Sequence, residues 1–457
     1  MADDSEAAVL QDQHPDVKVA PPGPRSRELA KRLEIVESPA FEARRDARAS
    51  TSGAEQAPIV YARGSGSNVF DVDGNRYVDL TAGFGALLMG YAPNAATEAA
   101  RAATSELPLA LGDVYASELK VRACEAIAGL FPEPGARVML GLSGADAVTC
   151  ALKTAALATK KMGVVAFDGA YHGLSYGPLA ACGLATSFRE PFAGQLGVNV
   201  TFAPYPSKDD PRGAEAALHE SVNAVRAALD KGSIGAVLVE PMLGRGGCVV
   251  PPASFLAALR SVTEEMGALL VVDEIWTGMG RSGAMLASDH EGVVADVICL
   301  GKGLGGGVPI SACVGRASAM EAWGAHGGGA IHTGTHFGSP PACAAALATI
   351  DAIRGGLAAR AAEVGARWHD ELVAAGARAS RTPWTVRGRG MMVGVRLADA
   401  GEALAVARAL LRRGYIVLTG GTRGDTLTLS PPLTIAAELL SAFVVELEAA
   451  VALHRRA

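Results

Sequence analysis

Aromatic side chains and charges are both scarce in this 457-residue sequence. Phe, Trp and Tyr make up 5% of it and charged residues 19%, whereas hydrophobic residues make up 49%. Few aromatic rings leave little surface for stacking bases, and a net charge of −6 offers no basic footprint for a phosphate backbone. The composition therefore argues against nucleic-acid binding and favours a protein with a large buried core that acts on small molecules.

Cysteines in metal-binding or redox spacing are also missing. The seven cysteines are scattered, odd in number and never arranged as C-x-x-C, so neither a disulfide framework nor a zinc site is expected. Each is expected to be a small buried apolar residue. His332 and His336 lie four residues apart, but Gly334 lies between them and no third ligand is evident. No metal site is therefore predicted.

Long apolar runs are the third absence. No continuous apolar run reaches the roughly 18 residues that cross a bilayer. The N-terminal stretch MADDSEAAVLQDQ lacks the basic and then apolar pattern of a secretion signal. The sequence predicts a cytoplasmic protein that does not bind membranes.

Strand and helix patterns alternate between about residues 95 and 344. Nearly continuous apolar runs at 137–142, 163–167, 235–240, 268–274 and 296–301 are typical of parallel strands buried on both faces. Stretches with helical spacing, such as 145–159 and 252–267, lie between them. We predict an α/β fold with a large, doubly wound and mostly parallel sheet in a domain of residues 91–344.

The flanking segments differ from this pattern. Residues 1–25 mix acidic residues, Gln and Pro, which predicts a flexible tail. Residues 26–90 begin with a helical stretch and then show a hairpin pattern around Asp73-Gly74. Residues 345–457 combine helices with strands that look antiparallel. We assign 26–90 and 345–457 to the N-terminal and C-terminal parts of a smaller α+β domain.

Ligands in open parallel sheets bind beyond the carboxyl ends of the strands, so the residues after each strand are candidate site residues. Ser143, Gly144 and Ala145 open a helix, and the free N–H groups at a helix start suit a phosphate. An ordinary helix cap is the alternative. Tyr171 and His172 follow the next strand, where an aromatic ring can stack on a flat cofactor or simply pack in a loop.

Two ionisable residues follow later strands. Asp273 either caps a turn or holds a proton on the nitrogen of a heteroaromatic cofactor. Lys302 lies among glycines, and desolvation of such an amine lowers its pKa so that it can attack an aldehyde. An exposed loop lysine is the alternative. The same glycines fit a dinucleotide-binding pattern, but the strand-like segment beginning at Pro309 stands where a helix should follow.

The order of these features is more specific than any one of them. The segments LSGADAV, AYHG, VEPMLGRGG, LLVVDEIWTGMGRSG, ICLGKGLGGGVPISA and HTGTHFGSPPACAAALA follow one another along the chain. Over roughly residues 55–440 the sequence resembles the class III aminotransferases, which are enzymes of fold type I that depend on pyridoxal 5′-phosphate. The resemblance implies transfer of an amino group from a primary amine or amino acid to a keto acid or aldehyde, in a ping-pong cycle.

The same resemblance implies a role for each site residue. Lys302 would form a Schiff base with the cofactor and move a proton, and Asp273 would pair with the ring nitrogen. The implied cofactor-binding residues are Ser143, Gly144 and Ala145 at the phosphate, Tyr171 and Ile275 on the two ring faces, Glu240 near the ring hydroxyl, His172 in support, and Thr335. This threonine would reach the phosphate from the neighbouring subunit of a homodimer.

The sequence departs from the family pattern at the substrate end of the site. Thr428 stands where many members that use glutamate carry an arginine, and Arg245 replaces a glutamate. We hypothesise that Arg245 recognises a substrate carboxylate; pairing with an acid, or solvation, are the alternatives. Phe84 and Trp276 are further candidate substrate residues. The missing arginine also leaves a racemase or aminomutase of the same family as the alternative function. A different class, either a structural or regulatory relative without the cofactor or a dinucleotide-dependent oxidoreductase, is the third alternative.

Overall fold

The computed structural model describes residues 12–92, 94–197, 199–326, 329–379 and 383–454, which form two compact units. The larger unit is Ala95–Ala362, and the smaller one combines Met1–Asn94 with Glu363–Ala457. The predicted boundary after residue 344 is therefore too early. Helix α11 (Pro340–Ala352) packs on α4 (Ala95–Glu106) and α5 (Glu118–Ala128), so its burial places it in the larger unit.

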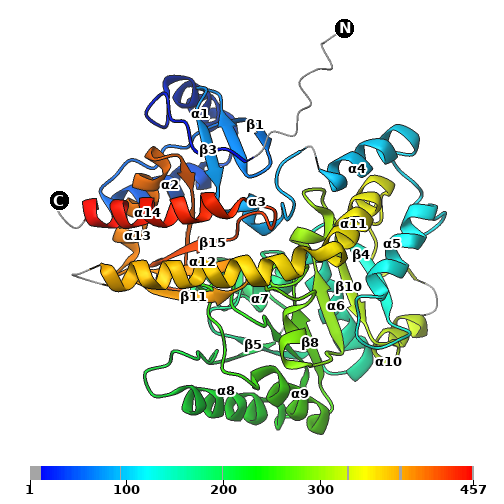
Figure 1. The fold of residues 1–457 in the computed structure, drawn as a ribbon. Helices are drawn as coiled ribbons and strands as arrows, with labels where there is room; N and C mark the ends of the chain where they lie inside the picture. The colour runs from blue at the N-terminus through cyan, green and yellow to red at the C-terminus, as the bar shows by residue number, and fades with distance from the viewer. Residues whose placement is uncertain (1–11, 93, 198, 327–328, 380–382, 455–457) are drawn as a thin grey trace. The chain divides into compact units, whose positions relative to one another are not determined.

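A mostly parallel sheet forms the centre of the larger unit, as predicted (Figure 1). Its strands, in spatial order, are β4 (Arg137–Gly141), β10 (Ser311–Gly315), β9 (Val297–Leu300), β8 (Leu269–Asp273), β7 (Ile234–Val239), β5 (Gly163–Phe167) and β6 (Val200–Ala203). Among these described strands, β10 alone runs in the direction opposite to the other strands. Edge strand β6 was not predicted, because it is short and only partly buried.

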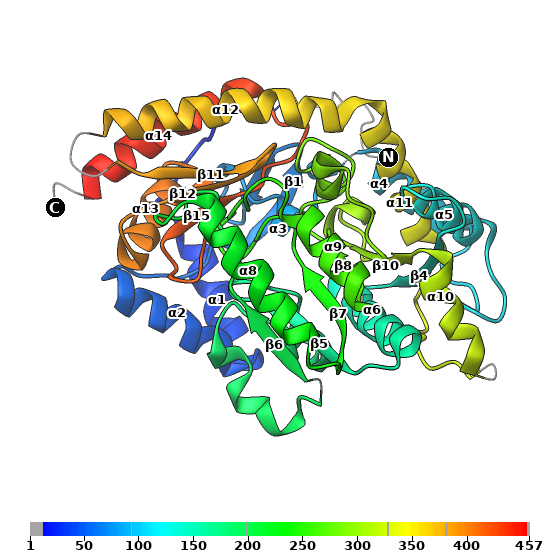
Figure 2. The same cartoon turned by 90° about the horizontal axis from the view of Figure 1, so that it is seen from below.

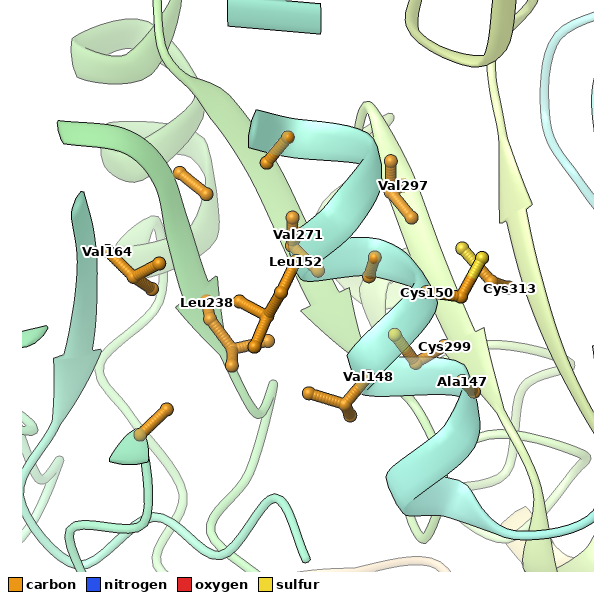
Figure 3. Packing of buried hydrophobic residues seen from close by; sticks show 14 of the residues in the cluster. Ala147, Val148, Cys150, Leu152, Val164, Leu238, Val271, Val297, Cys299 and Cys313 are labelled. Atoms are coloured by element: carbon orange, nitrogen blue, oxygen red, sulfur yellow. The ribbon is translucent and has the colours of Figure 1, made fainter. Parts of the chain in front are cut away.

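Helices cover both faces of this sheet, because successive side chains of a strand point to opposite faces. On one face Ala166 of β5 belongs to a cluster with Val148 and Leu152 of α6 (Gly144–Thr159), as Figure 3 shows for the two α6 residues. On the other face, Phe167 meets Phe255 edge to face at 5.5 Å between ring centroids. Phe255 begins α9 (Phe255–Met266), which lies beside α8 (Ala214–Leu229) in Figure 2.

The short helices α7 (Tyr176–Ala180) and α10 (Ala317–Met320) complete the larger unit. All seven cysteines are free, and six of them are buried. Three of the buried ones, Cys150 of α6, Cys299 of β9 and Cys313 of β10, lie in the cluster where α6 packs on the sheet (Figure 3). They pack there as small apolar side chains.

Two sheets and several helices make up the smaller unit. One sheet has the order β1 (Tyr61–Ser65), β2 (Asn68–Asp71), β3 (Arg76–Asp79), β13 (Tyr415–Ile416), and the other β11 (Thr385–Arg389), β12 (Met392–Arg396), β15 (Thr426–Leu429), β14 (Leu418–Gly420). Strands β2 and β3 form the predicted hairpin. The pairing of Tyr415 with Val78 joins the two parts of the chain that the sequence had assigned to one small domain.

The helices of the smaller unit are α1 (Pro24–Val36), α2 (Pro39–Ser52), α3 (Ala82–Gly85), α13 (Ala400–Arg412), α14 (Ala437–His454) and most of α12 (Ala358–Arg378). Residues 12–25 are not the flexible tail that the sequence predicted. The backbones of Asp16 and Arg76 exchange two hydrogen bonds of 2.9 Å, and Asn75 Oδ1 accepts from the N–H groups of Lys18 and Val19. Residues 1–11 of the predicted tail lie outside the described residues.

One helical stretch, Pro340–Arg378, is long and apolar enough to cross a membrane when only length and composition are considered. Core helices of soluble proteins pass the same test. Its first turns are buried in the larger unit, and Gly356 interrupts the regular helix with a φ of 122°. This stretch is therefore explained by packing within the fold.

Candidate functional site

The predicted cofactor residues meet at one edge of the central sheet. Strands β4, β5, β7, β8 and β9 run in the same direction, so their carboxyl ends share this edge. Ser143 follows β4, Tyr171 and His172 follow β5, Glu240 follows β7, Asp273 ends β8, and Lys302 follows β9. Strands β9, β8, β7 and β5 are consecutive neighbours in the sheet. The site residues at the ends of these four strands therefore lie on adjacent strands.

Asp273 is buried, and the surrounding residues fix both of its carboxylate oxygens. Oδ2 lies 2.7 Å from Nδ1 of His172, and Oδ1 accepts a 3.0 Å hydrogen bond from the N–H of Ile275. An ionised carboxylate only accepts hydrogen bonds, so Nδ1 is the donor when Asp273 is ionised. The sequence predicted only a supporting role for His172. The structure places it in direct contact with Asp273.

Glu240 links two loops of the site through its buried carboxylate. Oε1 accepts from the N–H of Tyr171 at 2.8 Å, and Oε2 accepts from the N–H of Gly244 at 2.9 Å. The hydroxyl of Tyr205 donates to the backbone oxygen of Glu240 at 2.9 Å. Tyr205 was missed because β6 was not predicted; its position just after a strand of the same sheet is the signal that would have found it.

Burial raises the pKa of Glu240 to about 6, and the charge of Asp273 adds to this effect, whereas His172 and the two N–H donors oppose it. The native state therefore binds more protons here than the unfolded chain between about pH 4.5 and 6. The stability that protonation of Glu240 contributes is present at low pH and is lost as the pH rises through this range.

We expect this titration to be visible in a comparison of the protein with its Glu240→Gln variant, which cannot ionise. When the pH is lowered from 7 to 4.5, the free energy of unfolding of the unmodified protein should rise by up to ~2 kcal/mol relative to that of the variant. Denaturant unfolding at both pH values measures this difference. The exposed Glu264→Gln change serves as a control and should show no such shift, and a constant difference for Glu240→Gln would contradict the assignment.

Lys302 is held in an unusual backbone conformation directly after β9. Its φ of 37° lies in the left-handed region that L-residues rarely adopt. Burial lowers the pKa of the Lys302 amine and Arg245 lowers it further, whereas Asp273 and Glu240 raise it. Its Nζ lies 4.7 Å from the ring centroid of Trp276. The structure thus provides a shielded amine close to two carboxylates, which is suited to nucleophilic attack on a carbonyl carbon.

The start of α6 offers an anion-binding position at the same edge. Ser143 caps the helix by accepting from the N–H of Asp146, whose carboxylate accepts from the N–H groups of Leu142 and Ser143. The N–H groups of Gly144 and Ala145 belong to the first turn, which has no intrahelical acceptors for them. A Cβ atom on Gly144 would lie 2.8 Å from Cδ1 of Ile275, so glycine permits this close approach.

Arg245 and Trp276 also lie in this part of the larger unit. The Arg245 guanidinium lies over the ring of Tyr171, 5.2 Å from its centroid, and the Arg245 side chain is partly exposed. Trp276 is only 6% exposed, and its indole N–H has no hydrogen-bond partner within the described part of the chain. Both residues were candidate substrate residues in the sequence, and both lie close to predicted cofactor residues.

Two predicted residues are not brought into these contacts. Thr335 is exposed in the segment that precedes α11, and its proposed contact requires a second subunit. Phe84 belongs to the smaller unit, where it is half exposed with a φ of 62°. Its predicted role at the substrate stays a prediction. Among the described residues, no group of three or more His, Cys, Asp and Glu side chains could hold a metal ion.

These features fit the cofactor that the sequence resemblance implies. A fixed, buried carboxylate suits a protonated ring nitrogen, a shielded amine suits an aldehyde, and a helix start suits a phosphate. The three groups come from Asp273, Lys302 and the Gly144-Ala145 turn, all at the carboxyl edge of one sheet. These three groups therefore fit pyridoxal phosphate.

Comparisons with known proteins give the same result. The family pattern described as "Aminotransferase class-III" matches residues 49–451. The chain is 37% identical over 437 residues to a 4-aminobutyrate aminotransferase of Mycobacterium tuberculosis (strain ATCC 25618 / H37Rv), covering 91% of this chain and 96% of that one. It is 36% identical over 392 residues to an acetylornithine aminotransferase of Methanopyrus kandleri, covering 85% and 93%.

Solved structures with similar folds include transaminases. An amine transaminase from an uncultivated Pseudomonas species, in the PLP-bound (internal aldimine) form, is 30% identical with a TM-score of 0.79, covering 86% of this chain and 95% of that one. An (S)-enantioselective omega-transaminase from Thermomicrobium roseum is 26% identical with a TM-score of 0.83, covering 93% and 98%. The similarity therefore extends over nearly the whole chain in both sequence and fold.

Proposed function

The chain belongs to the class III aminotransferases and depends on pyridoxal 5′-phosphate, and we propose that Lys302 and Asp273 are the residues that act on this cofactor. One observation carries the proposal. The shielded amine of Lys302 follows β9 and the fixed carboxylate of Asp273 ends β8, on adjacent parallel strands.

When bound, pyridoxal phosphate supplies an aldehyde to which a nitrogen attaches and a ring that withdraws electrons from the substrate Cα. In this proposal the unprotonated Lys302 amine would hold the aldehyde carbon with loss of water, would be released when the substrate amine replaces it there, and would then accept the proton from the substrate Cα. Asp273 keeps a proton on the ring nitrogen while His172 and the Ile275 N–H hold its oxygens. The N–H groups of Gly144 and Ala145 bind the phosphate.

A single-donor reaction tests the proposed ping-pong transfer. The purified enzyme is incubated with one amine donor and without an acceptor. One equivalent of carbonyl product per subunit is expected, and none beyond it until a keto acid is added. Exchange of the substrate Cα hydrogen with solvent deuterium, without any carbonyl product, would instead identify a racemase.

We also propose that Arg245 recognises a carboxylate of the substrate. It is partly exposed, it lies over the Tyr171 ring, and it is close enough to lower the pKa of Lys302. Glu240 holds both the N–H of Tyr171 and that of Gly244, the residue before Arg245. The relatives named for 4-aminobutyrate and acetylornithine act on compounds that carry a carboxylate, which is consistent with this role.

Arg245→Ala is expected to lower kcat/KM for 4-aminobutyrate by about 10- to 100-fold, the usual contribution of a hydrogen bond to a charged group. Kinetics with butylamine, which has the same chain length without the carboxylate, should change by less than about twofold. The exposed Arg212→Ala change is the matched control. Equal losses for both substrates would exclude carboxylate recognition by Arg245.

We further propose a homodimer in which Thr335 reaches the phosphate site of the partner subunit. The segment between α4 and α5 exposes several large apolar side chains: Leu107, Leu109, Leu111, Val114 and Tyr115. Such a patch is typical of an interface. Thr333 donates to Asp113 of this segment at 3.3 Å, so the Thr335 loop adjoins the patch.

The double change Leu111→Glu and Tyr115→Glu should give a monomer in sedimentation, whereas the isolated exposed Met162→Glu should leave the dimer intact.

A further inference from the structure

Trp276 makes a direct contact with Lys302. The face of its indole ring lies 4.7 Å from Nζ of Lys302, which is within the range of a cation–π interaction. The side chain is almost fully buried, and its N–H finds no acceptor among the described residues. The N–H of the buried Trp368 in the smaller unit also has no partner among the described residues, so the contact with Lys302 is the distinguishing feature of Trp276.

Another tryptophan of the same unit shows the contrast. Trp323 is partly buried, and its indole N–H donates to Oγ1 of Thr154 at 2.9 Å. Trp323 therefore satisfies its polar atom within the protein and serves as a control away from Lys302. The indole N–H of Trp276 has no such partner among the described residues, and its ring lies beside the Lys302 amine.

The Lys302 amine faces charges of both signs. Asp273 and Glu240 favour its protonated form, while Arg245 and burial disfavour it. A lysine side chain is a long flexible stem with a compact charge, so these charges alone do not fix its position. The face of an aromatic ring attracts an ammonium group and gives that attraction a direction.

Resting on the function proposed above, we propose that Trp276 is a positioning residue for Lys302. While Lys302 is not bonded to the cofactor, the ring face holds its side chain beside the substrate, and it attracts the ammonium group most strongly once the amine has accepted the Cα proton. The role needs the aromatic face and not the indole N–H. Phenylalanine should therefore replace tryptophan for this purpose, and an aliphatic residue of similar bulk should not.

The test measures the pKa of the free Lys302 amine in the enzyme. Full-length enzyme with cofactor is incubated with an amine donor alone and desalted, which leaves Lys302 free. Competitive acetylation with trace acetic anhydride over a range of pH then gives the pKa of Lys302 from the labelled peptide, without any activity assay. The variants are Trp276→Leu, Trp276→Phe and the control Trp323→Phe.

Trp276→Leu is expected to lower the pKa of Lys302 by about 0.4–1.5 units, the equivalent of a cation–π attraction of about 0.5–2 kcal/mol. Trp276→Phe should recover most of this shift, and Trp323→Phe should titrate as the unmodified enzyme does. An unchanged or raised pKa in Trp276→Leu would overturn the proposal, as would a shift in Trp276→Phe as large as that in Trp276→Leu. If the Leu variant does not fold, the Phe variant alone decides, because it must titrate close to the unmodified enzyme.

A failure of the proposed function looks different. In that case the donor alone would release no carbonyl product from the unmodified enzyme. If the unmodified enzyme does release it and only the titration of Trp276→Leu is unchanged, the positioning role of Trp276 fails while the proposed function stands.

Discussion

Lys302→Ala is expected to lower kcat by at least about 10²- to 10⁴-fold, the contribution typical of a positioned proton-transfer group. The variant should still bind pyridoxal phosphate, because the start of α6, Asp273 and Tyr171 are unchanged. An added small amine such as methylamine should restore part of the rate, since it supplies the missing base in solution. Steady-state kinetics and cofactor absorbance measure both effects.

The control for this change is Lys208→Ala, which removes an exposed lysine of the same unit. It should leave kcat unchanged. A Lys302→Ala variant that keeps more than about a tenth of the activity would show that the amine of Lys302 is not the group that moves the proton.

Asp273→Asn is expected to lower kcat by at least about 10- to 100-fold. Asparagine has almost the same shape and can still accept from the N–H of Ile275, but it carries no charge to keep a proton on the ring nitrogen. The ring then withdraws electrons from the substrate Cα less strongly. The loss should appear in kcat more than in the KM of the substrate.

Asp168→Asn provides a matched comparison, because Asp168 also follows a strand of the central sheet but is exposed. It should behave like the unmodified enzyme. If Asp273→Asn retained full kcat, the carboxylate would serve only to hold His172 and the loop at Ile275. A cofactor analogue that lacks the basic ring nitrogen would then support the same rate in Asp273→Asn and in the unmodified enzyme.

The sequence was sufficient for the main features of the fold because the strands of the central sheet are buried on both faces. Their continuous apolar runs end at positions such as Gly141, Phe167 and Leu300, within one or two residues of the predicted ends. Since parallel strands share a carboxyl edge, the residues that follow them could be assigned to one site from the strand pattern alone. The positions of Asp273 and Lys302 follow from this rule.

Features that depend on tertiary contacts could not be predicted in the same way. Strand β6 is partly exposed and too short for a clear pattern, so Tyr205 was not assigned to the site. The conformation of residues 12–19 is held by hydrogen bonds to Asn75 and Arg76, which lie some 60 residues away in the chain. The ring of Trp276 reaches Lys302 across 26 residues of sequence, and neither residue type nor spacing indicates that contact.

The central claim is that Lys302 bonds the cofactor, and borohydride reduction tests it directly. Reduction of the enzyme with its cofactor should fix the bond, abolish the visible absorbance of the cofactor and add the mass of a phosphopyridoxyl group to the peptide that contains Lys302. Peptide mass spectrometry then identifies the modified residue. A label on another lysine, or an enzyme that is unaffected by borohydride, would contradict the account.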